Sequence, residues 1–378
     1  MNKILIFATG YLPGKNYGGP VTSISNFVNL CGDELDIYIV TTNHDFKDTK
    51  VYDDIKPGWN KVGNAKVLYL SDAHFTYKRL KNLVGEIRPN LIYQNSFFNP
   101  KLSIPLLFLA KFNKEKLFVA PRGELLPNAL EQKFIKKSLF ITFIKMLNLI
   151  KNVSFQATTN EERDKIIEVL GIDSDRVITL GNLPSLPRYQ ENKQKKEAGK
   201  LRLVFIARIH PIKNLHFAIE CLKGIKGNVS FNIYGSKEIQ DYWGQCLQSI
   251  SELQQNIIVN YCGIAARDEV HHIFSSHDAM LLPTLTENYG HSIVEAMLSN
   301  CPVVISNNTP WTDINSFGAG WAISLEKPNE YKKVLQELVN MPNDEYQELL
   351  VKNKKYIQNK LKIEELKNQY INTFTQIL

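Results

Sequence analysis

Short apolar segments alternate with longer amphipathic segments along almost the whole chain, and this alternation limits the possible folds more than any other feature. The amphipathic segments have the periodicity of helices, and the short segments are typical of buried strands. A helix that joins two strands brings them back parallel through a right-handed crossover. The pattern therefore predicts an α/β fold built on doubly wound parallel sheets. In the first half the expected strands cover residues 3–9, 36–42, 66–70, 90–94, 116–120, 154–158 and 177–180.

Residues 184–200 interrupt the alternation with two prolines, several lysines and few side chains to bury. Such a composition is typical of a linker between domains. The alternation restarts at residue 201, and two domains suit a chain of 378 residues better than one core does. We expect two Rossmann-like domains, residues 1–183 and 201–378, that face each other across a cleft. The last helix is expected within residues 345–378, and packing of this helix against the first domain is one alternative.

The net charge of +7 suits an anionic ligand, an anionic membrane surface or nucleic acid, and does not choose among them. The apolar run from Ile4 to Ala8 is too short for a secretory signal, and no run approaches the ~18–20 apolar residues of a membrane span. The five cysteines form no C-x-x-C pair and lie in or beside apolar patterns. We therefore expect buried free thiols, a reducing cytoplasm and no metal site.

Two loops, one in each half, follow strands and offer groups for a phosphate. The loop from Gly10 to Pro20 holds four glycines, and the helix behind it presents free N–H groups. A plain glycine-rich turn is the alternative. In the second half, Arg208 could fork across two oxygens of a diphosphate while Lys213 acts as a point charge. A solvated basic loop is the alternative there. Gly235 ends another strand, as either a donor contact or a turn residue.

The segment 282–297 carries the strongest signal, because a strand ends there, a polar loop follows and a helix begins near Ser292. Glu287 and Asn288 lie in that loop, where backbone N–H groups and polar side chains suit sugar hydroxyls and phosphate. Glu287 caps nothing obvious. Glu295 has two interpretations, because Ser292-x-x-Glu295 is also a capping box that would only close the helix.

Arg122 and Glu124 follow the strand at residues 116–120, at an edge where acceptor-side or phosphate-side groups are expected. The alternative is a surface ion pair between them. The helix from Gln132 to Ile150 combines lysines with many apolar residues. A core face with a basic rim is the default interpretation, and contact with an anionic bilayer is the alternative.

Together these motifs resemble glycosyltransferase family 4, the retaining enzymes with the GT-B fold, and the resemblance covers most of the chain. E-N-Y-G-H-S-I-V-E-A-M is similar to the family's E-x7-E motif, and A-R-I-H-P-I-K-N is similar to its Arg/Lys phosphate clamp. Gly18-Gly19-Pro20, A-P-R-G-E-L and Thr309-Pro310-Trp311 resemble the members that build bacterial surface polysaccharides.

The resemblance implies that Arg208 and Lys213 bind the donor diphosphate and stabilise the leaving nucleotide. Glu287 would hold the sugar and stabilise the charge that develops at its anomeric carbon. Arg122 stands where many relatives have a histidine, so no catalytic base is identified. The remaining implied contacts are the sugar with the backbone of Asn288, Tyr289, Gly290 and His291, the ribose with Glu295, the phosphates with Gly18 and Gly19, and the acceptor with Asn95, Arg122 and Glu124.

By resemblance the chain is a retaining hexosyltransferase that moves sugar from a nucleotide-diphosphate sugar to a glycan acceptor. A lipid-linked oligosaccharide acceptor is expected, in the synthesis of capsule, O-antigen or exopolysaccharide. The resemblance implies no metal and no cofactor, since Arg and Lys supply the cations. It places the enzyme in the cytoplasm, at the inner face of the plasma membrane if the helix 132–150 contacts lipid, with no nucleic acid partner. The alternatives are a sugar-nucleotide epimerase of similar fold, and a non-enzymatic membrane-surface or nucleic-acid-binding protein.

Overall fold

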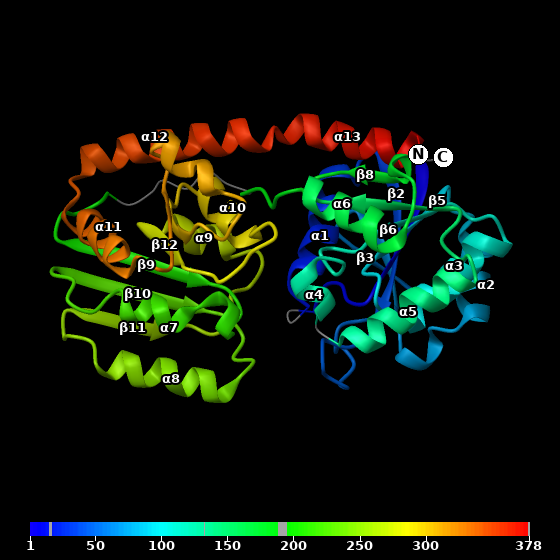
Figure 1. Cartoon of the computed structure of the whole chain (residues 1–378), viewed down its shortest axis with the longest axis horizontal. Coiled ribbons are helices and arrows are strands. Elements are labelled where there is room, and N and C mark those ends of the chain that lie inside the picture. Colours follow the sequence, from blue (N-terminus) through cyan, green and yellow to red (C-terminus); the bar gives the residue numbers. More distant parts are fainter. Residues whose placement is uncertain (15–16, 132, 188–194, 377–378) are drawn as a thin grey trace. The chain divides into compact units, whose positions relative to one another are not determined.

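The computed structural model describes residues 1–14, 17–131, 133–187 and 195–376. The chain divides into two compact units, each with one central sheet and helices on both sides of it (Figure 1). Unit 1 comprises Met1–Leu183 and Ile363–Leu378, and unit 2 comprises Pro184–Lys362. The last helix, α13 (Ile363–Gln376), therefore belongs to unit 1, which was the option left open by the sequence, and unit 2 ends before residue 378.

Within the described residues, unit 1 is built on an eight-stranded sheet in the order β3-β4-β2-β1-β5-β6-β7-β8. Neighbouring strands are parallel except β3 and β4, which form an antiparallel edge. The sequence analysis missed β3, because its side chains are alternately exposed and half-buried and form no apolar run. The strands are β1 (Asn2–Ala8), β2 (Leu35–Thr42), β3 (Trp59–Val62), β4 (Ala65–Leu70), β5 (Leu91–Asn95), β6 (Leu117–Ala120), β7 (Val153–Ala157) and β8 (Val177–Thr179).

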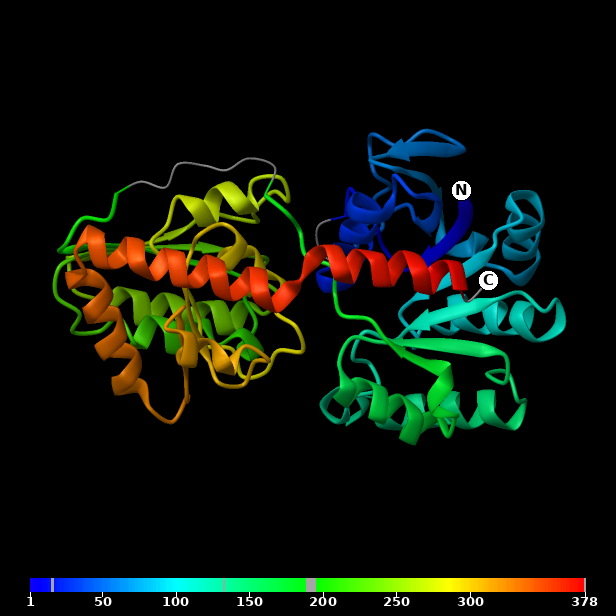
Figure 2. The same cartoon turned by 90° about the horizontal axis from the view of Figure 1, so that it is seen from above.

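Side chains of β1 alternate between two hydrophobic cores, one on each face of the sheet. Leu5 and Phe7 join the core covered by α2, α3, α5 and α6, whereas Ile4 and Ile6 join the core covered by α1 and α13. Phe374 of α13, the red helix in Figure 2, packs on a phenylalanine of α1 with 4.8 Å between ring centroids. The helices are α1 (Gly19–Cys31), η1 (Asp72–His74), α2 (Tyr77–Ile87), α3 (Pro100–Phe112), α4 (Pro127–Glu131), α5 (Phe134–Met146), α6 (Asn160–Leu170) and η2 (Ser174–Arg176).

Unit 2 contains, within the described residues, a six-stranded parallel sheet in the order β11-β10-β9-β12-β13-β14. Helices α7 and α8 lie on one face, and α9, α10 and α12 lie on the other (Figure 1). The strands are β9 (Lys200–Ile206), β10 (Asn228–Tyr234), β11 (Ile257–Tyr261), β12 (Ala279–Leu282), β13 (Val303–Ser306) and β14 (Trp321–Ile323). The helices are η3 (Pro211–Lys213), α7 (Leu215–Glu220), α8 (Gln240–Ser251), α9 (Val270–Ser275), α10 (His291–Leu298), η4 (Thr312–Phe317), α11 (Pro328–Asn340) and α12 (Asn343–Leu361).

Several expectations about local structure change. The helix expected from Gln132 to Ile150 is α5, which ends at Met146. The helical stretch expected over residues 345–378 is divided, because Lys362 separates α12 from α13 in the left-handed conformation. Within the expected linker, residues 188–194 lie outside the described residues, but Lys196 is buried and its ammonium donates to the carbonyl of Glu197 at 2.9 Å. The five cysteines are free as expected, but Cys262 is exposed rather than buried.

Candidate active site

Two loops of unit 2 meet at the carboxyl edge of its sheet, where ligands of such folds bind. One loop follows β9 and the other follows β12, and these two strands are parallel neighbours although β10 and β11 lie between them in sequence. The loops are joined by hydrogen bonds to one carbonyl. Ile212 O accepts from the Leu285 N–H at 2.8 Å and from the Thr284 hydroxyl at 2.9 Å. The two segments singled out in the second half of the sequence are therefore in contact.

Lys213 and Glu287 form an ion pair where these loops meet. Their side chains are only 15% and 18% exposed, so solvent screens the pair less than it screens a surface pair. Lys213 ends the short helix η3, which is capped by His210, whose Nδ1 accepts from the Ile212 N–H at 3.2 Å. A buried cation and a carboxylate are thus fixed side by side at the sheet edge.

The loop before α10 has a left-handed conformation at Gly290, which favours glycine. This residue has φ of 78°, and a Cβ there would lie 2.8 Å from the Ile293 Cδ1. Trp311 holds the loop from the other side, because its indole N–H donates to the Tyr289 carbonyl at 2.6 Å and the two rings pack edge to face. The Glu287 N–H donates to a neighbouring carbonyl at 3.1 Å. The backbone of the loop is therefore set before any ligand arrives.

The capping-box interpretation of Glu295 is wrong. Helix α10 begins at His291 with Gly290 as its N-cap, so Ser292 already lies inside the helix, and no side chain caps the helix within the described residues. Burial raises the pKa of Glu295 to about 7, against the opposing effect of the Arg267 charge. A carboxyl group that titrates near neutrality inside α10 fits a functional role better than a capping role.

Arg208 is the most exposed member of the predicted clamp, and it pairs with a residue that the sequence analysis missed. Its Nη1 donates to both oxygens of Glu238, at 2.9 and 3.2 Å. The signal for Glu238 is weak, since it is one acid a few residues after β10. Gly235 lies beside them, and a Cβ there would come within 1.8 Å of the Ala207 carbonyl oxygen. This close approach explains the glycine without a ligand, so its donor contact remains a prediction.

In unit 1, the glycine loop is fastened to the ends of β2 and β4. The hydroxyl of Tyr17 lies 2.8 Å from the Thr42 hydroxyl, and the hydroxyl of Tyr69 donates to the carbonyl of Leu12. Gly18, with φ of 68°, precedes the first turn of α1, and both Gly18 and Gly19 are exposed. The N-terminus of α1 has no side-chain cap within the described residues. Its backbone N–H groups suit an anion, as the sequence predicts.

The guanidinium of Arg122 belongs to a hydrogen-bond network with uncharged side chains. Its guanidinium donates to Asn95 Oδ1 at 2.8 Å, to Asn182 Oδ1 at 2.7 Å and to the Tyr93 hydroxyl at 2.7 Å. The surface ion pair with Glu124 that was considered as an alternative is wrong. Because the network joins the ends of β5 and β6 to the last residues of the first segment of unit 1, Arg122 positions these segments. Arg122 and Asn95 are in contact, as two acceptor-side residues would be.

Glu124 serves a separate network. Its carboxylate accepts from the Ser96 hydroxyl at 2.7 Å and from the backbone N–H groups of Phe97 and Phe98. Burial raises the pKa of Glu124, and these hydrogen bonds oppose the increase. The carboxylate therefore fixes the loop after β5, and its acceptor contact remains a prediction.

The described residues contain no group of three or more His, Cys, Asp or Glu arranged to hold a metal ion. None of the described helices has the length and apolar character that crossing a membrane requires.

Comparison with known proteins identifies the fold and the chemistry. Residues 188–358, almost all of unit 2, match the family model described as glycosyl transferases group 1. HepE from Anabaena, solved with UDP and glucose, superposes with a TM-score of 0.72 at 15% identity, and the match covers 100% of both chains. The chain is a glycosyltransferase of the GT-B fold.

Two further proteins resemble this chain, one by sequence and one by fold. The O-antigen chain mannosyltransferase RfbU of Salmonella typhimurium is 21% identical over 273 residues, which are 68% of this chain and 73% of RfbU. WaaG, a glycosyltransferase involved in lipopolysaccharide biosynthesis, superposes with a TM-score of 0.69 at 12% identity, covering 98% of this chain and 99% of WaaG. The family match favours a transferase over the epimerase and the non-enzymatic alternatives.

Proposed function

We propose that this glycosyltransferase is a retaining, metal-independent member of family 4. It transfers a hexose from a nucleotide-diphosphate sugar to a lipid-linked glycan acceptor during synthesis of a bacterial surface polysaccharide, such as capsule, O-antigen or exopolysaccharide. The observation that carries the donor assignment is the contact between Lys213 and Glu287 at the N-terminus of α10. RfbU and WaaG support the polysaccharide assignment through their descriptions.

The donor chemistry needs positive charge at the departing diphosphate and negative charge near the anomeric carbon. When the donor binds, its phosphate replaces Glu287 as the ion-pair partner of Lys213. The Glu287 carboxylate is then free to contact the sugar. Arg208 exchanges Glu238 for phosphate oxygens in the same way. The bond between the anomeric carbon and the phosphate oxygen then breaks with its electrons on the diphosphate, where these two cations stabilise them. An acceptor hydroxyl oxygen bonds to the anomeric carbon, and its proton passes to the departing phosphate. Such fixed cations take the place of a metal ion.

The ribose and the sugar are held by the rest of α10 and its loop. The backbone from Asn288 to His291 contacts sugar hydroxyls, and Glu295 accepts hydrogen bonds from the ribose. Preorganisation by Gly290 and Trp311 supports this proposal, because a set backbone loses little freedom when the ligand binds. HepE, the neighbour solved with UDP and glucose, supports the choice of a nucleotide sugar as donor.

Helix α5 supports contact with an anionic membrane at the inner face of the plasma membrane. Only Phe140 and Ile144 of this helix are buried, while Phe134, Ile135, Leu139 and Met146 are 63–73% exposed. Exposed Lys133, Lys136 and Lys145 accompany them, whereas Lys137 turns inward to the carbonyl of Ala129. The helix is thus more exposed than a core helix with a basic rim. Gln132, the expected first residue, lies outside the described residues.

Vesicle binding tests the membrane contact. The protein should sediment with phosphatidylglycerol vesicles and not with phosphatidylcholine vesicles, and an Ile135→Gln/Leu139→Gln variant should remain in solution. Val351→Gln, which changes a side chain of α12 that is 68% exposed, is the matched control and should still sediment. The membrane assignment fails if the protein ignores both kinds of vesicle and modifies only water-soluble acceptors.

A panel of nucleotide sugars tests the donor assignment on the full chain. A ligand that binds only the folded state raises the unfolding temperature. At least one nucleoside-diphosphate sugar should raise it, and the same compound should be consumed with release of its nucleoside diphosphate when acceptor is supplied. If no compound of the panel changes the unfolding temperature, the non-enzymatic alternative regains support.

A further inference from the structure

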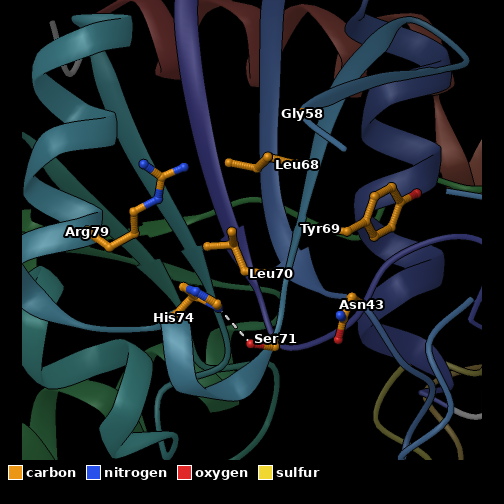
Figure 3. A pocket seen from close by; sticks show the side chains of 8 residues that line it. All are labelled: Asn43, Gly58, Leu68, Tyr69, Leu70, Ser71, His74 and Arg79. Carbon is orange, nitrogen blue, oxygen red and sulfur yellow. Dashed lines mark hydrogen bonds between the residues drawn. The ribbon is translucent and has the colours of Figure 1, made fainter. Parts of the chain in front are cut away.

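A cavity of about 570 Å³ opens in unit 1 at the carboxyl end of β4 (Figure 3). It lies where β3 no longer covers β4, because the register between these strands ends with Trp59 opposite Leu68. The side chains that follow along β4 therefore border open space on that side. The lining residues are Asn43, Gly58, Leu68, Tyr69, Leu70, Ser71, His74 and Arg79.

The wall of the cavity carries hydrogen-bond donors that make no hydrogen bond with the described residues. Arg79 is a half-buried residue, and its guanidinium makes no hydrogen bond or ion pair with any described residue; neither does the side-chain amide of Asn43. The Ser71 hydroxyl lies 2.7 Å from His74 Nδ1, which orients the imidazole. Figure 3 shows Arg79 and His74 on the side of β4 to which Leu70 points. Donors over an apolar floor are typical of a small-molecule site.

Arg79 forms no ion pair with any described acid. The two acids nearest along the chain are Asp72 and Glu86, each seven residues away, and both are exposed. Asp72 is already paired, with His44 Nε2 at 3.2 Å and with Lys101 at 3.7 Å. Lys78 and Lys81 add positive charge on the same helix. Carboxylates and phosphates fit the planar fork of an arginine whose donors make no contact within the protein.

The cavity adjoins the glycine loop of unit 1. Tyr69, one of the lining residues, donates its hydroxyl to the carbonyl of Leu12 in that loop. Asn43, another lining residue, is followed by His44, whose carbonyl accepts from Tyr17 of the same loop at 3.1 Å. A ligand in the cavity would therefore lie next to the segment that leads to Gly18 and Gly19.

We propose that this cavity binds an anionic group, a carboxylate or a phosphate, carried by the glycan acceptor. Arg79 forms the charged contact, Asn43 and the pair of Ser71 and His74 supply hydrogen bonds, and the leucines contact the sugar ring. The subsite selects acceptors with a uronate or a phosphorylated sugar over neutral ones. The inference rests on the proposed function, because it assumes that unit 1 receives an acceptor.

Calorimetry on the full chain tests the subsite with three probes: a disaccharide ending in glucuronic acid, the same disaccharide ending in glucose, and the glucose form bearing a phosphate. The wild-type protein should bind at least one of the acidic probes about tenfold or more tightly than the neutral probe, as a charge-assisted hydrogen bond allows. Whichever acidic probe is preferred distinguishes a uronate from a phosphate. Arg79→Gln should remove the preference.

Lys81→Gln is the matched control, because it removes one positive charge two residues away, on the opposite face of α2. It should keep the preference. Equal binding of the three probes by the wild type, no binding of either acidic probe, or the same loss in both variants would overturn the subsite. Stabilisation by nucleotide sugars is measured on the same samples. If stabilisation is present and the preference is absent, the subsite is wrong and the proposed function stands.

Discussion

Lys213 and Glu287 are 74 residues apart in the sequence and form an ion pair at the carboxyl edge of the unit 2 sheet. Two strands bring them together, β9 and β12, which are neighbours in the sheet but not in the chain. The pair links the two segments that carry most of the functional argument. In the absence of a donor, each group serves as the counter-ion of the other.

Removing either member of this pair should abolish most sugar transfer. In Lys213→Ala the leaving diphosphate loses a fixed cation, and in Glu287→Gln the sugar loses a fixed carboxylate. The loss of one such group costs on the order of 10²–10³ in turnover. Initial rates of nucleoside diphosphate release measure the effect, and circular dichroism verifies the fold.

Lys223→Ala is the matched control for these variants. This lysine also forms ion pairs, with Glu220 and Glu252, but on the surface of α7 and α8. It should keep normal turnover. Near-normal turnover in both Lys213→Ala and Glu287→Gln would refute the site assignment.

Glu238→Gln should tighten donor binding, because Arg208 then no longer has to break an ion pair with Glu238 before it contacts the diphosphate. The pair is largely exposed, and such pairs contribute about 0–1 kcal/mol, so the gain should be at most about fivefold in the donor KM. Glu252→Gln, which removes a surface acid elsewhere, should leave the KM unchanged. A weaker affinity in Glu238→Gln would mean that Glu238 contacts the donor itself.

Trp311→Phe should raise the donor KM by about tenfold, because it removes the indole N–H that holds the Tyr289 carbonyl and leaves that carbonyl without its buried partner. The buried carbonyl without its donor should also lower the unfolding temperature by a few degrees, although the aromatic packing is largely kept. The tryptophan of β14, changed as Trp321→Phe, is the control and should behave as the wild type. A purely structural role of Trp311 predicts the lower stability alone, with an unchanged KM.

The raised pKa of Glu295, about 7, predicts a particular pH dependence of stability. In the unfolded chain a glutamate ionises near pH 4.3, so between about pH 4.5 and about pH 7 the folded protein holds one more proton than the unfolded chain. The free energy of unfolding therefore falls as pH rises through this window and levels off above it. In Glu295→Gln this contribution is absent.

Urea unfolding at about pH 5 and about pH 8 measures this contribution as a difference between variant and wild type. Glu295→Gln should gain stability relative to the wild type at the higher pH. Burial lowers the pKa of His271 to about 4, so the free energy of unfolding falls as the pH drops below the usual pKa of a histidine. This effect is common to both proteins and cancels in the difference. A difference that does not change with pH would show that Glu295 titrates normally.

The sequence predicts the parallel strands well, because strands buried on both faces of a sheet form apolar runs. All side chains of β5 and β6 are buried, and both strands were expected near their observed positions. The edge strand β3 was missed because it has a partly exposed, antiparallel environment.

The candidate site was only partly predictable. The residue types in the two loops of unit 2 indicate phosphate and sugar chemistry, but the contact between Lys213 and Glu287 depends on strand order, which the chain order does not reveal. The network of Arg122 was hidden for a similar reason, since its partners Tyr93 and Asn182 lie 29 and 60 residues away in the sequence. Local patterns show which groups are present, and the topology decides which of them meet.

A crystal structure of the full chain with a bound nucleoside diphosphate is the most direct test of the donor site. The diphosphate should lie within hydrogen-bond distance of Arg208 and Lys213, with the Lys213–Glu287 pair broken and the ribose at Glu295. A nucleotide bound elsewhere, with Lys213 still paired to Glu287, would contradict the central claim.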